Sequence, residues 1–297
     1  MQLPQDPIFI VGYPRSGTTL LQRILAAQPG LFTFPETHYF CVIEKKIKWE
    51  SEGRESIPPG SLAVIFEKIV EKMNLRFTAS ELETLHRQAA NKKLSSKTLF
   101  ETIVIHYLLN LYPEITDGFS FRWIEKTPNH AHFLERIIAL YPRAQALHIL
   151  RHPVPTIYSR KLKFPFNRET PVIELARRWN RMLRDVEHFK KRYPDPVFTL
   201  RYEDLVQNME KQLRETVDFL KVSFDFKILA AMKQEKKQNA EAFILPSETW
   251  KQEDLRLDMR TTNESYHDLI PAADIAAIEE ITMENMNRYG YKPFGRG

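Results

Sequence analysis

The residues from Gly12 to Thr19 read Gly-Tyr-Pro-Arg-Ser-Gly-Thr-Thr and join a short apolar run to a helix-like segment. Backbone N–H groups in a loop bracketed by glycines converge on one point, and the start of the following helix adds a partial positive charge. The hydroxyls of Thr18 and Thr19 can donate further hydrogen bonds, and Arg15 adds a full charge on a planar, bidentate fork. This combination predicts a binding site for an anionic group.

The loop is close to the G-x-x-x-x-G-K-[ST] pattern of loops that bind nucleoside triphosphates, but Thr18 stands where that pattern has lysine. Because that lysine normally reaches the β- and γ-phosphates, its absence argues against a kinase or an NTPase. The apolar run at 144–150 ends in Arg151, where a magnesium-binding strand would favour aspartate. Arg15 and Arg151 therefore predict an anion site that needs no metal ion.

A second set of anion-binding side chains follows the run at 144–150. Arg151 comes at the carboxyl end of an expected buried strand, which is where open α/β sheets bind their ligands. Ser159 follows eight residues later, about two turns into the next helix, and Lys163 lies one turn beyond it. A solvated basic helix is the alternative for this segment taken alone. Together with the first loop, the pattern favours a site for a second phosphate.

Both sets of side chains must be positioned by strands and helices, and the patterns predict a parallel sheet. Short runs rich in β-branched and aromatic residues indicate buried strands at 8–11, 121–124, 144–150 and 197–200. Helices are expected at 18–27, at 129–141, from Pro153, over 172–189 and near the C-terminus. This alternation favours an α/β fold in three layers, whose central parallel sheet has about four to five strands flanked by helices.

The residues from 36 to 112 contain amphipathic stretches and almost no strand signal. We expect them to form a helical insert within one domain that spans residues 1–297. Ser80 and Glu83 fit a capping box that would open one of the helices of this insert.

The composition is ordinary for a globular protein, with 43% hydrophobic and 27% charged residues, and it excludes a disordered chain or a collagen-like fibre. The one cysteine, Cys41, excludes an intramolecular disulfide, and we expect it to be a small buried residue. The N-terminus lacks the features of a signal peptide, and no apolar run approaches the ~20 residues of a membrane span. We therefore expect a cytoplasmic protein.

The net charge of +5 is concentrated in one segment. Residues 151–200 carry 12 basic and 5 acidic side chains, a local charge of +7, and the rest of the chain sums to −2. The segment begins at Arg151, so a small phosphorylated ligand explains the charge better than nucleic acid does. No basic stripe interleaved with aromatic residues, as nucleic-acid binding would require, is present in the sequence.

Taken together, these motifs resemble those of the sulfotransferases that use 3′-phosphoadenosine-5′-phosphosulfate (PAPS). The segment 13–19 resembles their 5′-phosphosulfate loop, and Arg151 with Ser159 resembles their 3′-phosphate motif. The order and spacing of the motifs are kept over residues 8–222. Within this range the resemblance includes two further segments, Glu125-Lys126-Thr127-Pro128-Asn129 and Arg201-Tyr202-Glu203-Asp204-Leu205. Near the C-terminus it also includes Tyr289-Gly290-Tyr291.

The resemblance implies that the three-layer fold is of the P-loop type, that PAPS is the donor co-substrate, that adenosine 3′,5′-bisphosphate (PAP) is the product, and that no metal ion is needed. It implies in-line transfer of the sulfuryl group to a hydroxyl or an amine of an acceptor. It assigns the 5′-phosphosulfate to Arg15, Ser16, Gly17, Thr18 and Thr19. It assigns the 3′-phosphate to Arg151 and Ser159, with Lys163 as a weaker addition, and it places Tyr202 near the adenine. A tyrosine that only packs after a strand is the alternative for Tyr202.

The resemblance also bears on the group that removes the acceptor's proton. Many sulfotransferases have a histidine two residues after the lysine of the middle segment, and here that position is Pro128. A branch that includes protein-tyrosine and many bacterial sulfotransferases uses a glutamate after the first helix, where this chain has Glu36. We expect Glu36 to be the general base, with His38 in reserve and capping of the next helix as the alternative role. Lys126 is expected to stabilise negative charge on the leaving phosphate or the sulfuryl oxygens.

Two other functions stay open, a small-molecule kinase with the same P-loop architecture and a nucleotide-binding module without catalysis. The expected acceptor is a small molecule, a lipid or a glycan with a free hydroxyl. An apolar or aromatic acceptor is suggested by the aromatic side chains in the insert and after Lys163: Phe40, Trp49, Phe164 and Phe166.

Two further groups of residues are candidates for cofactor binding or metal binding. A basic loop near the C-terminus would complete the cofactor site, with Lys251, Arg256 and Arg260 as candidates. His130 and His132 could suggest a metal ion, but no carboxylate or further histidine lies at ligand spacing. We expect both histidines to lie on a helix surface.

Overall fold

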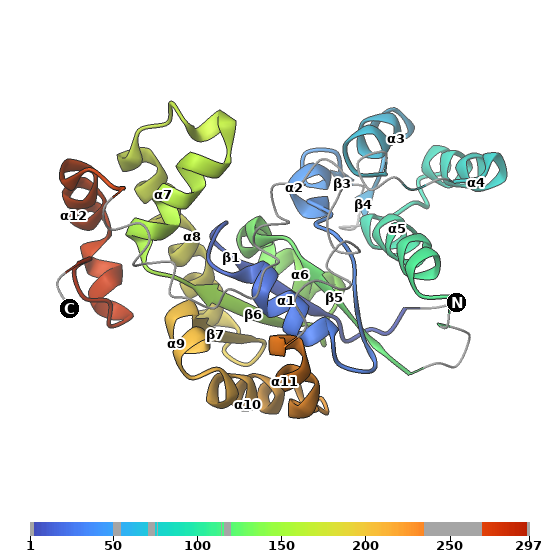
Figure 1. The fold of residues 1–297 in the computed structure, drawn as a ribbon. Coiled ribbons are helices and arrows are strands. Elements are labelled where there is room, and N and C mark those ends of the chain that lie inside the picture. Colours follow the sequence, from blue (N-terminus) through green and yellow to red (C-terminus); the bar gives the residue numbers. More distant parts are fainter. Residues whose placement is uncertain are drawn as a thin grey trace.

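The computed structural model describes residues 3–49, 55–70, 75, 77–113, 115, 120–234 and 269–295. Its centre is a five-stranded sheet in the order β2-β5-β1-β6-β7, and every neighbouring pair of strands in it is parallel (Figure 1). The strands are β1 (Ile8–Gly12), β2 (Leu31–Thr33), β5 (Arg122–Lys126), β6 (Gln145–Leu150) and β7 (Val197–Arg201). The predicted α/β fold with a central parallel sheet is thus confirmed.

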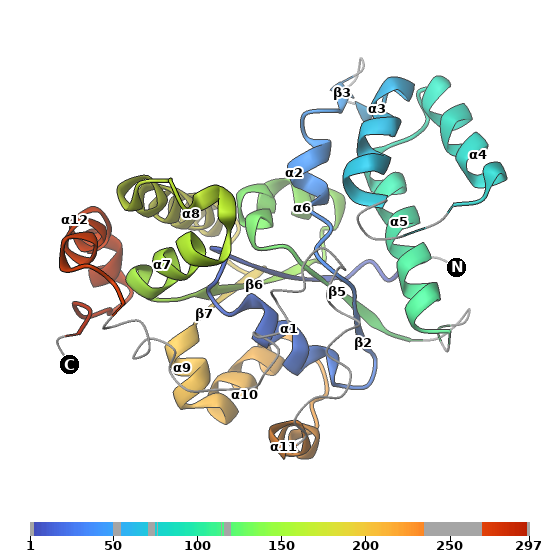
Figure 2. The same ribbon diagram turned by 45° about the horizontal axis from the view of Figure 1, so that its top comes forward.

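Helices cover both faces of the sheet (Figure 2). The side chains of a strand point alternately to its two sides, and in β1 both sets are apolar and buried, so both faces must be covered. In β1, Ile8 and Ile10 pack into the core under one helical layer, whereas Phe9 and Val11 pack into the core on the other side. The first layer consists of α1 (Thr18–Ala26), α9 (Tyr202–Gln207), α10 (Met209–Leu220) and α11 (Phe226–Gln234). The second contains α6 (Leu134–Leu140), α7 (Pro153–Lys163), α8 (Val172–Arg192) and α12 (Ala272–Arg288).

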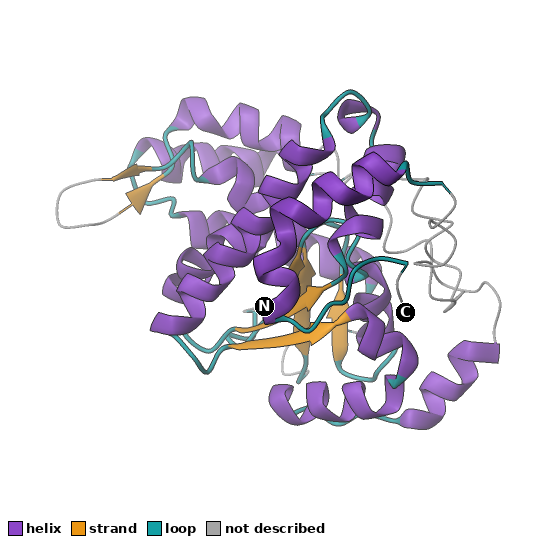
Figure 3. Ribbon diagram, turned by 90° about the vertical axis from the view of Figure 1, so that its left-hand side faces the viewer, coloured by secondary structure: helices purple, strands orange, loops and turns teal. Residues whose placement is uncertain are grey.

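The expected insert contains helices and one small additional sheet. Its helices are α2 (Tyr39–Ile43), α3 (Pro59–Ile65), α4 (Ala79–Ala90) and α5 (Ser96–Leu111), and a π-helical turn at Phe66–Val70 extends α3. The strands β3 (Lys48–Trp49) and β4 (Glu55–Ser56) pair antiparallel and lie apart from the main sheet (Figure 3). The capping box that opens α4 is formed by Thr78 and Glu81, so its prediction at Ser80 and Glu83 is wrong by two residues.

Two further differences from the sequence-based expectations concern the surroundings of the site. Strand β2 was not expected, because its three residues are too few to show a pattern. The segment 129–141 is not one α-helix, because a 3-10 helix at Pro128–Phe133 precedes α6. A 3-10 helix has three residues per turn, so its side chains point in other directions than those of an α-helix would. Within the described ranges, no helix is both long and apolar enough to cross a membrane.

Candidate active site

The loop between β1 and α1 needs glycine at two positions. Gly12 and Gly17 have positive φ angles of 152° and 98°. A Cβ atom on Gly12 would lie 2.4 Å from the carbonyl oxygen of Ile149, and one on Gly17 would lie 2.4 Å from Cδ2 of Tyr202. The backbone of the loop therefore fits closely against β6 and α9, which fixes the direction of its N–H groups.

Ser16 adds a polar group to this loop that fits an anion. Its side chain is buried, and its Oγ has no hydrogen-bond partner among the described residues. A buried hydroxyl without a partner costs free energy, and an anion held by the loop would accept a hydrogen bond from it. Thr18, at the start of α1, is also buried.

The second predicted set of residues lies against this loop. The Nε of Arg15 donates to Oγ of Ser159 at 3.1 Å, and Nη1 of Arg151 donates to the carbonyl oxygen of Arg15 at 3.1 Å. The guanidinium carbon of Arg151 lies 4.7 Å from the centre of the Tyr202 ring. The structure thus places Arg15, Arg151, Ser159 and Tyr202 in one cluster, although they come from three separate segments of the chain.

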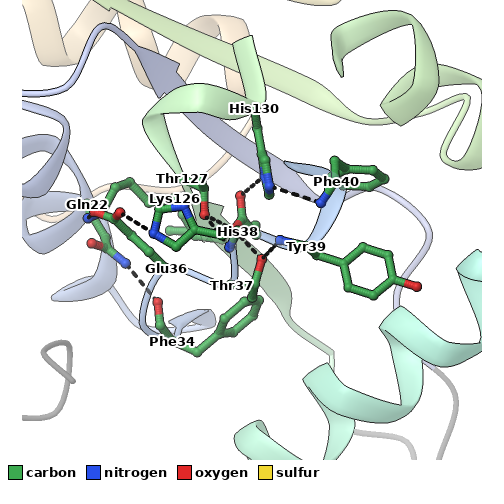
Figure 4. Close-up of polar contacts among 12 residues, drawn as sticks. Gln22, Phe34, Glu36, Thr37, His38, Tyr39, Phe40, Lys126, Thr127 and His130 are labelled. Carbon is green, nitrogen blue, oxygen red and sulfur yellow. Dashed lines mark hydrogen bonds and ion pairs between the residues drawn. The ribbon is translucent and has the colours of Figure 1, made fainter. Parts of the chain in front are cut away.

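A third set of side chains extends the cluster in the direction of β5. Lys126 is the last residue of β5 and is 1% exposed. Its Nζ donates to Oγ1 of Thr19 at 3.4 Å and forms an ion pair with Oε1 of Glu36. Figure 4 shows Lys126 and Glu36 pointing toward each other. The two opposite charges thus compensate each other in a buried position.

His38 contacts the other oxygen of the same carboxylate. Its Nε2 lies 3.3 Å from Oε2 of Glu36, and its side chain is 43% exposed. Partial burial acts to lower the pKa of His38, but hydrogen bonds with Cys41 and Glu36 outweigh it and raise that pKa to about 10. His38 is therefore an imidazolium at neutral pH and donates to Glu36.

The expectations for Cys41 and His130 were wrong. Cys41 is half-buried; burial acts to raise the pKa of its thiol, but hydrogen bonds with His130 and His38 lower that pKa to about 7. His130 is fully buried instead of lying on a helix surface, and its Nδ1 donates to Oε2 of Glu125 at 2.8 Å. The 3-10 turn at Pro128–Phe133 directs it inward.

No metal site follows from these histidines. His132 lies at the surface, where its Nδ1 is 2.6 Å from Oδ2 of Asp185. In the part of the chain that the structure describes, no group of three or more His, Cys, Asp or Glu side chains is arranged to hold a metal ion.

The aromatic residues expected near the acceptor fall into two classes. Phe40 is fully buried and packs with its ring centre 5.5 Å from that of Phe100, so it belongs to the core and not to an acceptor pocket. The rings of Phe164 and Phe166 lie 5.3 Å apart after α7, and Phe166 is 72% exposed. The side chain of Trp49 lies outside the described residues.

Four basic residues remain among the predicted cofactor contacts, and the described residues include one of them. Lys163 follows Ser159 by four residues on α7, so it lies on the same face of that helix and is partly exposed. Lys251, Arg256 and Arg260 lie outside the described residues.

Sequence reasoning missed three polar residues beside this site: Thr37, Glu125 and Thr127. All three are buried and bonded to one another, with Oγ1 of Thr37 and of Thr127 donating to Oε1 of Glu125. The available signals were their position next to Glu36 and Lys126 in the chain and, for Glu125 and Thr127, the resemblance of the segment 125–129 to the sulfotransferases. A pairing across 88 residues leaves no pattern in a single sequence.

Comparisons with known proteins show which family the chain is similar to. The model of the "Sulfotransferase family" matches residues 7–225. Protein-tyrosine sulfotransferase 1 of Danio rerio is 26% identical over 223 residues, which are 75% of this chain and 55% of that protein. The sulfotransferase domain from the curacin biosynthetic pathway superposes with a TM-score of 0.60 at 21% identity, covering 98% of this chain and 99% of that one. Mouse sulfotransferase SULT7A1, solved in complex with PAP, gives a TM-score of 0.54 at 14% identity and covers 96% and 85%.

At these identities the solved structures show a shared fold. The chain spans between about a quarter and about half the length of the curated relatives it matches, 26% of an Aquifex aeolicus protein and 55% of the Danio rerio protein. The family match at residues 7–225 covers well over half of the chain and includes β1, β5, β6 and β7 with the loops that follow them. The chain therefore belongs to the sulfotransferase family.

Proposed function

We propose that the chain transfers the sulfuryl group of PAPS to a hydroxyl or an amine of an acceptor, with Glu36 as the general base. The supporting observation is the convergence of three sets of side chains at the carboxyl edge of β1, β5 and β6. Arg15 belongs to the loop at residues 13–19, the donor loop, and donates a hydrogen bond to Ser159. Lys126 donates to Thr19 at the end of this loop and forms an ion pair with Glu36. A nucleotide with a phosphate at one end and a reacting group at the other needs this order of contacts.

The residues present fit a bisphosphorylated nucleotide. We assign the 5′-phosphosulfate to the loop Arg15–Thr19, where the buried Ser16 hydroxyl has a proton to donate. Arg151 and Ser159 would hold the 3′-phosphate, with Lys163 in support, and Tyr202 would lie beside the adenine. The mouse sulfotransferase that shares this fold was solved with PAP, which supports the assignment of the cofactor.

The chemistry expected of these residues is a displacement at sulfur. A bond forms between sulfur and the acceptor oxygen, and the bond between sulfur and the 5′-phosphate oxygen breaks. Glu36 takes the proton that the acceptor oxygen loses. Arg15 and Lys126 stabilise the negative charge that develops on the sulfuryl oxygens and the leaving phosphate.

Glu36 is a better candidate for the base than His38. The pKa of about 10 leaves His38 protonated at neutral pH, so it has no lone pair with which to accept a proton. As an imidazolium in contact with Glu36 it can orient the carboxylate and balance its charge. Lys126 does the same at the other oxygen.

The acceptor is proposed to be a small molecule, a lipid or a glycan with a free hydroxyl. His38 is 43% exposed and contacts the largely buried Glu36, so an incoming hydroxyl would approach the base from the side of His38. The exposed Phe166 beside Phe164 favours an acceptor with an apolar or aromatic part.

The cofactor assignment is tested by titrating the protein with PAP in a calorimeter, without added magnesium. We expect Arg151→Ala to weaken PAP binding by about 10-fold or more, because a charge-assisted contact is lost. Arg177→Ala is the matched control, since Arg177 is exposed on α8, and it should bind PAP as the wild type does. Equal affinity of Arg151→Ala and wild type would remove the 3′-phosphate assignment. Tight binding of magnesium-ATP without binding of PAP would favour a kinase.

A further inference from the structure

The turn that carries Glu36 is held by side chains that the proposed chemistry does not use. The backbone N–H of His38 donates to Oγ1 of Thr127 at 3.3 Å, and that of Tyr39 donates to Oγ1 of Thr37 at 3.2 Å. The N–H of Phe40 donates to Nε2 of His130 at 3.3 Å. Figure 4 shows these three contacts side by side at the start of α2. Three consecutive N–H groups are therefore fixed by side chains, one each.

The three acceptors converge on one buried carboxylate, Glu125, which is 0% exposed. Its Oε1 accepts from the hydroxyl of Thr37 at 2.9 Å and from that of Thr127 at 2.6 Å, and its Oε2 accepts from Nδ1 of His130 at 2.8 Å. Burial acts to raise the pKa of Glu125, but its contacts with His130, Thr127 and Thr37 outweigh it and lower that pKa. Glu125 is thus ionised and can only accept.

The direction of the two threonine bonds follows from this charge. A hydroxyl has a single proton, so a threonine that donates it to Glu125 has only lone pairs left for the backbone N–H. His130 donates from Nδ1 to Glu125. Burial acts to lower the pKa of His130, but its contacts with Glu125 and Cys41 outweigh burial and raise that pKa to about 9, so Nε2 accepts from Phe40 only in the neutral ring. Without an acceptor at position 125, the hydroxyl protons of Thr37 and Thr127 would no longer be held away from the backbone N–H groups of the turn.

The turn needs this support. His38 is a non-glycine residue with a positive φ of 51°, a conformation that persists only where neighbours fix it. His38 is also the N-cap of α2, and its own side chain makes no cap bond to the helix. The caps come instead from Thr37, Thr127 and His130, and through them from Glu125.

We propose that Glu125 is a positioning residue that holds the turn at 36–38 so that the Glu36 carboxylate lies against Lys126. Glu125 and Lys126 are neighbours in β5, so their side chains leave the strand on opposite sides. One strand end thus supplies both the anchor of the turn and the cation that the base contacts. The catalytic consequence rests on the proposed function, because it takes Glu36 as the base.

The most informative variants are Thr37→Val and Thr37→Ser. Valine keeps the shape of threonine but removes the hydroxyl that links Glu125 to the turn, whereas serine keeps it. Glu125→Gln removes the charge of the anchor itself. Glu187→Gln is the matched control, because Glu187 accepts from the Tyr289 hydroxyl at 2.5 Å between α8 and α12, away from the turn.

The first measurement is an NMR titration of the His38 ring, which needs neither a cofactor nor turnover. Contacts with Cys41 and Glu36 together raise the pKa of His38, so a displaced Glu36 would lower that pKa by its share while the Cys41 contact stays. We expect Thr37→Val and Glu125→Gln to lower the pKa of His38, as Glu36→Gln does. Thr37→Ser and Glu187→Gln should titrate as the wild type does. Wild-type titration of both Thr37→Val and Glu125→Gln would overturn the proposal.

The second measurement is the release of PAP from PAPS, with 4-nitrophenol or water as the acceptor. We expect Thr37→Val and Glu125→Gln to lower kcat by about 10- to 100-fold with an unchanged KM for PAPS, because a small misplacement of a reacting group costs this much. Thr37→Ser should retain kcat. A normal kcat in Thr37→Val, with a strong loss in Glu36→Gln, would overturn the catalytic part of the proposal while the proposed function stands. Full turnover in Glu36→Gln would instead contradict the proposed base, and the NMR titration would then still decide whether Glu125 positions Glu36.

Discussion

At the scale of single residues, the site is defined by a carboxylate between two cations. Glu36 pairs with Lys126 through one oxygen and with the His38 imidazolium through the other. A carboxylate in this position can accept a proton from a hydroxyl that reaches it. The charge balance also explains why a lysine that is 1% exposed is tolerated at the end of β5.

The role of Glu36 predicts a large loss of rate without a loss of cofactor. Glu36→Gln keeps the size of the side chain but removes the proton acceptor, so kcat should fall by about 100-fold or more. PAP affinity, measured by calorimetry, should change little, because Glu36 lies outside the donor loop. Turnover at the wild-type rate would remove Glu36 from the role of base.

The His38–Glu36 pair predicts a pH-dependent contribution to stability. The pKa of His38 is raised to about 10 in the folded state, above its ordinary value of 6.5, so its stabilisation is fully present below about pH 6.5 and is lost as the pH rises to about 10. Because the side chain is 43% exposed, we expect no more than about 1 kcal/mol. Denaturant unfolding should show His38→Gln to be less stable than the wild type at pH 6 and nearly equal to it at pH 10. A difference in stability that is the same at both pH values would contradict the pair.

At the scale of elements, the sheet could be predicted because four of its strands are apolar runs with β-branched residues. Strand β2 escaped prediction, since Leu31–Thr33 is short and gains its place only by pairing with β5. His130 was misplaced because a helical period was assumed where the chain forms a 3-10 turn that points this side chain at Glu125. The loop residues Arg15 and Arg151 could be foreseen, because glycines and a strand end mark their positions locally. The bonds of Glu125 with Thr37 could not, because they join segments far apart in the chain.

The fit of the donor loop against α9 predicts a contrast between two glycines. In Gly17→Ala, the new methyl group would meet the Tyr202 ring at 2.4 Å, and φ is 98°, so the loop must shift. In Gly60→Ala, at the start of α3, nothing lies within 4 Å of the new methyl group. We expect Gly17→Ala to weaken PAP binding by about 10-fold or more and Gly60→Ala to leave it unchanged, as measured by the shift in melting temperature that PAP produces. A full PAP-induced shift in Gly17→Ala would contradict this packing.

At the scale of the whole molecule, the basic excess of residues 151–200 has two locations. Arg151 and Arg160 face the donor loop, where Arg151 donates to Arg15 and Arg160 lies 4.7 Å from the centre of the Tyr13 ring. Arg177 and Arg181 instead lie on the exposed side of α8. The charge of the segment thus supports an anionic ligand through the buried Arg151 and the partly buried Arg160, while Arg177 and Arg181 lie toward solvent.

The proposed function as a whole is tested most directly by following ³⁵S-labelled PAPS with a panel of phenols, alcohols and amines, in buffer with no added magnesium. The wild-type chain should move the label to at least one acceptor and form PAP in equal amount, and Glu36→Gln should lose both products together. Absence of labelled product and of PAP with every acceptor, while magnesium-ATP phosphorylates members of the same panel, would contradict sulfuryl transfer.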